Sequence, residues 1–282
     1  MSVITTNTLK SVEPKKHGGA GTMRFSSPLM LISMEVRKLK GSSFWWMLIG
    51  MIILVSLWSG FAVMKRTGGN PATRTLTLTQ GDIYQTISLL APILAALLTS
   101  RLAILETSER MDLKWLSLGQ GETRRFFAKL AVAGTALSQV FIIPLTWTPL
   151  AALAMGFKSD GDLSSLILAP ALIAFLSSLA VAAIQLMLSM TVKKQAVGLG
   201  VGVIASLVGS GLGPMNVARL GWFFPAGISS AASPFLTTAT PDGYARMALT
   251  TNPWILVLTS LIACISWTSI SAFVITVGES HR

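Results

Sequence analysis

The sequence contains few charged residues, one cysteine and two histidines. Charged residues make up 12% of the 282 positions, about half the share found in a soluble domain. Hydrophobic residues make up 52%, and the mean hydropathy is +0.66. These proportions predict an integral membrane protein. The single cysteine, Cys264, lies in an apolar run and excludes an intramolecular disulfide bond.

The scarcity of histidine also limits the chemistry that the chain can perform. His17 and His281 both lie close to the chain ends, so no histidine is available for a metal site or a catalytic pair within the membrane. We therefore expect no catalytic residues, no metal and no cofactor on this chain. The net charge of +11 does not predict nucleic-acid binding, because no basic patch interleaved with aromatic residues stands on a soluble module.

Six apolar runs are the main structural signal. They predict an all-α integral membrane protein with six transmembrane helices, since a helix of about 20 apolar residues crosses the ~30 Å hydrocarbon core. Pro144 and Pro149 are expected to kink the third helix or to end it early. Residues 214–252 are expected to form a re-entrant or interfacial segment. The six predicted spans are 44–64, 83–100, 130–157, 163–192, 196–212 and 253–277.

The distribution of basic residues predicts the orientation. Sixteen of the 22 Lys and Arg residues fall in the tails and loops on one side of the six-span arrangement, and cytoplasmic loops carry such an excess. Both termini are therefore expected in the cytoplasm of a multi-pass protein in the cytoplasmic membrane. Residues 1–27 are rich in Ser, Thr, Lys and Gly and are expected to be a disordered cytoplasmic tail.

An amphipathic helix is predicted over residues 28–40, before the first span. Leu29, Ile32, Val36 and Leu39 share one face at helical spacing. This pattern is typical of a helix that lies in the cytoplasmic membrane interface. The alternative is a simple extension of the first span. The charged residues that lie away from the apolar face include Glu35, Arg37 and Lys38.

The densest charged segment is 106–129, between the second and third spans. Glu106 and Arg110 stand four residues apart, a spacing that supports a helix. Met111, Trp115 and Leu118 follow at helical spacing, which predicts a short helix with one apolar face. Such a helix is suited to a protein partner. A solvated loop that only maintains topology is the alternative.

The predicted spans contain no Asp, Glu, Lys, Arg or His, so coupling to an ion gradient is not expected. Gln85, Gln139 and Gln185 are the polar residues inside them; interhelical hydrogen bonding is favoured over the lining of a translocation path. Two GxxxG steps predict close helix packing in the fifth span. No strand precedes these glycines and no Lys-Ser or Lys-Thr follows, which excludes a phosphate loop. The glycines are Gly198, Gly202, Gly209 and Gly213.

Two segments, LISMEVRKLKGSSFWWMLI (31–49) and ETSERMDLKWLSLGQGETRRFFAKL (106–130), resemble the ABC-2 permeases of the lantibiotic-immunity and bacitracin-resistance type. Glu35 and Lys38 match the first motif of that family. Gln120 and Gly121 stand where the family has a proline-containing turn. The second motif is matched by Glu106, Lys114, Trp115, Leu116, Leu118, Arg124 and Lys129.

This resemblance implies a six-helix permease domain over 28–282 that works as a pair with a second permease subunit, identical or homologous, among membrane lipids. Separate ABC ATPase subunits would bind ATP and Mg and engage a coupling helix within 106–125. The cargo would be a hydrophobic or amphipathic compound exported from a bacterial cell, such as an antimicrobial peptide against which the cell protects itself. A membrane scaffold or a passive channel remains the alternative. The expected coupling residues are Glu106, Glu109, Asp112, Lys114, Trp115, Leu116, Leu118 and Arg124.

Overall fold

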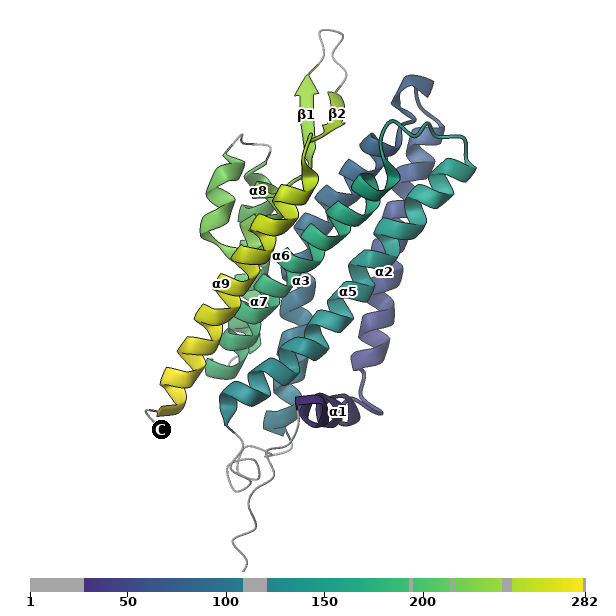
Figure 1. The fold of residues 1–282 in the computed structure, drawn as a ribbon. Helices are drawn as coiled ribbons and strands as arrows, with labels where there is room; N and C mark the ends of the chain where they lie inside the picture. The colour runs from purple at the N-terminus through teal and green to yellow at the C-terminus, as the bar shows by residue number, and fades with distance from the viewer. Residues whose placement is uncertain are drawn as a thin grey trace, which may run out of the picture.

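The computed structural model describes residues 28–108, 121–192, 195–213, 215, 217–239 and 245–280. Long helices pack side by side in an elongated bundle, with a short helix across one end and a two-stranded hairpin at the other (Figure 1). The helices are α1 (Pro28–Lys38), α2 (Phe44–Thr67), η1 (Pro71–Thr73), α3 (Leu76–Ser108), α5 (Glu122–Ala154), α6 (Leu163–Thr191), α7 (Gln195–Gly211), η2 (Ala218–Phe223), η3 (Pro225–Gly227), α8 (Ile228–Ala231) and α9 (Pro253–Ser280), and the strands are β1 (Phe235–Ala239) and β2 (Ala245–Leu249).

Five of these helices, α2, α3, α5, α6 and α9, are long and apolar enough to cross a membrane. This confirms a helical membrane protein. The sixth apolar helix, α7, has 17 residues and extends about 25 Å, which is shorter than the ~30 Å hydrocarbon core. The segment of η2, η3 and α8 follows it and packs against α6 and α7.

Several predicted boundaries were wrong, because polar residues extend the helices beyond their apolar runs. Helix α3 begins at Leu76 rather than at residue 83, and α5 begins at Glu122 rather than at residue 130. Helix α5 also continues through Pro144 and Pro149 to Ala154, so neither proline ends it early. Helix α1 ends at Lys38, two residues before the predicted end.

A neutral side chain from another helix compensates for one of these prolines. Pro149 has no N–H group, so the carbonyl of Leu145, four residues earlier, lacks its usual helical donor. The side-chain amide of Gln80 in α3 donates to that carbonyl at 3.0 Å, and Gln80 is fully buried. A hydrogen bond from a neighbouring helix thus allows α5 to remain helical through the proline.

We call the end of the bundle that carries β1 and β2 the hairpin end, and the opposite end the α1 end (Figure 1). At the hairpin end the loop before α6 is joined to the start of α3. The side chain of Asp160 accepts hydrogen bonds from the backbone N–H of Thr77, at 3.1 Å, and from its hydroxyl, at 2.8 Å. Arg66 at the end of α2 forms an ion pair with Asp82 in α3.

The segment between α7 and α9 is also attached to α3 at this end. Tyr84 donates a hydrogen bond to the carbonyl oxygen of Ser229 at 2.8 Å, and the hydroxyls of Ser88 and Ser229 are 2.6 Å apart. The ring of Tyr84 also packs against Phe235 of β1. β1 and β2 pair antiparallel with Phe235 opposite Leu249. The sequence analysis predicted no strands, so the all-α description needs this small hairpin added.

Candidate functional site

A buried carboxylate at the α1 end joins α1 to the helix bundle. Glu35 is 5% exposed and accepts hydrogen bonds from two lysines. Lys38, one turn later in α1, lies 2.7 Å from Oε1 of Glu35, and Lys129 of α5 lies 3.2 Å from Oε2. Because a buried charge is costly unless it is paired, the carboxylate and the two ammonium groups are expected to hold α1 against α5.

Lys129 lies inside the protein, whereas the sequence analysis assigned it to the charged segment before the third span. It is 1% exposed and also donates to the carbonyl of Leu102 in α3, at 3.4 Å. Phe126 and Leu130, both buried, flank it on α5. A single ammonium group therefore contacts α1 and α3 from α5, and the three helices meet at one point.

Other polar contacts surround this point at the α1 end. Arg101 of α3 donates to the hydroxyl of Ser43, just before α2. Arg125, also largely buried, lies 3.9 Å from Glu122 in the first turn of α5. The hydroxyls of Thr123 and Thr276 are 2.9 Å apart, which brings the start of α5 to the end of α9. At the α1 end, the last part of α3, the start of α5 and the end of α9 thus lie close to one another. Helix α1 and Ser43, the residue that precedes α2, lie beside them.

The predicted coupling residues divide between two helices and the connection that joins them. Glu106 belongs to α3, and Arg124 is an exposed residue of α5, so neither belongs to a separate coupling helix. Arg37 of α1 is exposed, in contrast to Glu35 and Lys38. The remaining predicted residues, Glu109, Asp112, Lys114, Trp115, Leu116 and Leu118, lie outside the described residues.

The glycines of α7 allow two different close contacts. A Cβ atom added at Gly202 would lie 2.5 Å from the Cβ of Ala96 and 3.2 Å from the carbonyl oxygen of Pro92, both in α3. A Cβ added at Gly209 would collide with the backbone of Ala226 in η3. Gly213 has open space around it, and Gly198 faces α6 at ordinary contact distances from Ser189 and Gln185.

The buried amide of Gln185 in α6 fills the opening that two of these glycines leave. With its NH₂ group oriented toward Gly198, the side chain of Gln185 donates a hydrogen bond to the carbonyl oxygen of Gly198 at 3.0 Å. Its amide oxygen accepts a hydrogen bond from the N–H of Gly202 at 3.2 Å. Gln85 and Gln139 are instead exposed on α3 and α5. Of the three glutamines, Gln185 therefore forms hydrogen bonds between helices in the interior of the chain, whereas the other two lie on its surface.

Two buried polar residues were missed by the sequence analysis. Gln80 was assigned to a loop, although the proline four residues after Leu145 was a signal that a donor was needed there. The contact between Tyr84 and Ser229 joins residues 145 positions apart, and no pattern in the sequence indicates it. Within the described ranges, no three His, Cys, Asp or Glu residues gather in a way that could hold a metal ion.

Comparison with known proteins agrees with this architecture. A family model described as ABC-2 family transporter protein matches residues 31–209, from α1 to the last turn of α7. The match includes Glu35, Lys38 and Lys129 and the whole connection between α3 and α5. No curated protein matches the chain. Because the matched region covers more than half of the sequence and includes α2, α3, α5, α6 and most of α7, the chain belongs to the ABC-2 transporter family and is a membrane permease of an ABC transporter.

Proposed function

We propose that this permease exports a hydrophobic or amphipathic compound, and that a separate ATPase subunit binds at the α1 end of the bundle. The contact that supports this proposal best is the buried cluster of Glu35, Lys38 and Lys129. Lys129 lies at the start of α5, shortly after the connection from α3. A partner that displaces this connection would move α5, and through Glu35 it would also move α1.

The orientation follows from charge. In the six-span arrangement 16 of the 22 Lys and Arg residues fall on the same side as α1, and we infer that this side faces the cytoplasm, where ATP is available. Both termini would then be cytoplasmic. We place the ATPase contact on the connection between α3 and α5, where Trp115 and Leu116 supply an aromatic and an aliphatic anchor. ATP and Mg would be bound by the ATPase.

The nature of the cargo follows from the apolar middle of the bundle. Every charged residue in the described parts of the five long apolar helices and α7 lies within eight residues of a helix end. A strongly charged cargo would therefore find no counter-charge at mid-membrane, whereas an apolar or amphipathic one requires none. An antimicrobial peptide against which a bacterial cell protects itself fits this description. As in the resembling permeases, a second permease subunit would complete the transport path.

The test combines binding and activity in reconstituted membranes. We expect the double variant Trp115→Ala, Leu116→Ala to weaken ATPase binding by about 2 kcal/mol or more, as loss of a buried anchor does. It should also abolish substrate-stimulated ATP hydrolysis. Ser108→Ala, at the end of α3, is the matched control and should change neither. Pull-down of the ATPase and hydrolysis rates with and without substrate are the measurements.

A second variant tests whether the buried cluster transmits the movement. Glu35→Gln removes the charged carboxylate that Lys129 contacts in α1, and it should reduce substrate-stimulated hydrolysis while the ATPase still binds. If the Trp115, Leu116 variant inserts normally, binds the ATPase and responds fully to substrate, the connection is not the coupling element, and a scaffold or a channel becomes the better description.

A further inference from the structure

One face of α2 points away from the bundle and carries a groove. The inward residues of α2 include Leu48, Met51 and Val55, which are spaced three or four residues apart and are buried. On the opposite side Trp58 is 60% and Phe61 70% exposed. The groove lies among these exposed residues and has a volume of about 740 Å³.

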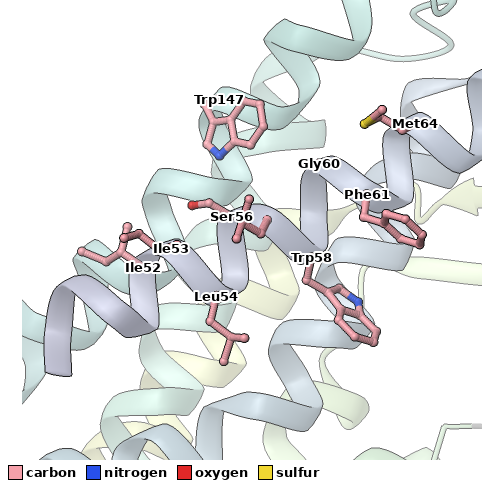
Figure 2. A pocket seen from close by; sticks show the side chains of 10 residues that line it. Ile52, Ile53, Leu54, Ser56, Trp58, Gly60, Phe61, Met64 and Trp147 are labelled. Carbon is pink, nitrogen blue, oxygen red and sulfur yellow. The ribbon is translucent and has the colours of Figure 1, made fainter.

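The wall of the groove comes from two helices. Figure 2 shows Trp147 reaching from α5 toward α2, while the other labelled residues belong to α2. Trp147 stands beside Gly60, since a Cβ atom at this glycine would lie at an ordinary contact distance of 3.4 Å from the indole ring. Ser56 is the only lining residue with a polar side chain other than the two indoles. The volume and the apolar walls are those of a small-molecule site, so the occupant must be apolar over most of its length.

The residue types favour a lipid over a second protein helix. Transmembrane helices associate through small residues that let their backbones approach. On α7 such residues are used in this way, whereas most of the outward face of α2 presents large side chains such as Leu57, Trp58 and Phe61. The small residue Gly60 has the indole of Trp147 beside it. These large side chains keep the backbone of a neighbouring helix at a distance.

A positive charge stands at the end of this groove. Lys65 directly follows the lining residue Met64 and stands four residues after Phe61, on the same face of α2. It is exposed, and within the described residues it forms no ion pair. Arg66, its neighbour, is already paired with Asp82.

We propose that the groove between α2 and Trp147 binds one acyl chain of an anionic phospholipid, whose phosphate lies at Lys65. Ser56 and Gly60 leave space for the chain, Trp58 and Phe61 flank it, and the ammonium group selects the headgroup. The site lies at the hairpin end, away from the proposed ATPase contact, and it does not depend on the direction of transport.

Native mass spectrometry of the detergent-solubilised full chain, titrated with phosphatidylglycerol, tests this assignment. The wild type should retain one lipid through detergent washes that remove the others. Ser56→Phe fills the groove and should weaken binding at least tenfold, whereas Ile262→Phe, on an exposed face of α9, should not. Lys65→Gln should weaken phosphatidylglycerol binding about fivefold and leave binding of uncharged diacylglycerol unchanged.

Three results would overturn the proposal. Equal lipid retention by Ser56→Phe and Ile262→Phe would mean that only bulk lipid covers α2. No retained lipid in the wild type would mean that the groove has no affinity of its own. A wild-type dimer that dissociates in Ser56→Phe would mean that a second copy covers the groove. ATPase pull-down should be normal in every variant, so failure here is separate from failure of the coupling proposal.

Discussion

Helices α2 and α7 both flank the central bundle, yet they are attached to it in different ways. Helix α2 presents large inward side chains, among them Phe44, Leu48 and Met51, and packs through them. Helix α7 presents Gly202 and Gly209, so that backbone lies against backbone. The comparison shows that hydropathy alone does not specify how a membrane helix is held, because lipid is as apolar as the protein interior.

Polar contacts strengthen this difference. Ser206 of α7 donates to the carbonyl of Leu89 in α3, and Ser230 donates to the carbonyl of Gly209 at 2.6 Å. Together with the amide of Gln185, these contacts join α7 to α3, α6 and the segment that follows it. Comparable contacts require close approach of the backbones, which glycine permits. We therefore expect α7 to be sensitive to single added methyl groups and α2 to be tolerant on its outward face.

The largest effect is expected at Gly202. In Gly202→Ala the new Cβ would collide with Ala96, and overpacking of this kind costs about 1–3 kcal/mol. Gly200→Ala is the matched control, because a Cβ there meets nothing within 4 Å. Reversible unfolding in mixed detergent, monitored by circular dichroism, gives the free energy of unfolding of each variant. Equal stability of the two variants would show that α7 does not pack closely on α3.

A smaller effect is expected at Gln185. Gln185→Leu keeps the volume of the side chain but removes both hydrogen bonds to the backbone of α7. Interhelical hydrogen bonds in membranes contribute about 0.6–2 kcal/mol, so a loss of about 1 kcal/mol in the free energy of unfolding is expected. Gln139→Leu, at an exposed glutamine of α5, is the control and should be neutral. Loss of stability only in Gln139→Leu would reverse the roles assigned to the two residues.

The sequence predicted the apolar runs well and the helix ends poorly. The stretch before residue 83 contains Gln80 and Asp82 and was therefore assigned to a loop, yet it is helical. Asp160 accepts from the first turn of this stretch, and Gln80 finds a carbonyl that Pro149 leaves without a donor. Both partners lie more than 60 residues away, beyond the reach of any local pattern.

A partner that is distant in the sequence also explains why the burial of Lys129 was not predicted. A lysine that precedes an apolar run is read as a boundary residue, because a buried ammonium group is costly. In the structure the carboxylate of Glu35 compensates for that cost at 3.2 Å, and the helix begins two turns earlier than predicted. The two family motifs contained one of these residues each, but they did not indicate that the residues form a pair.

The smallest effect is expected on the outward face of α2. Trp46 is 77% exposed, and in a membrane or micelle its ring contacts lipid or detergent in the folded and the unfolded state alike. Trp46→Leu should therefore change the free energy of unfolding by less than about 0.5 kcal/mol. Ile204→Ala, on the exposed face of α7, is the matched measurement and should be equally neutral in the isolated chain. If Trp46→Leu destabilises the chain as much as Gly202→Ala does, another part of the protein covers this face of α2, and the contrast between the two helices is lost.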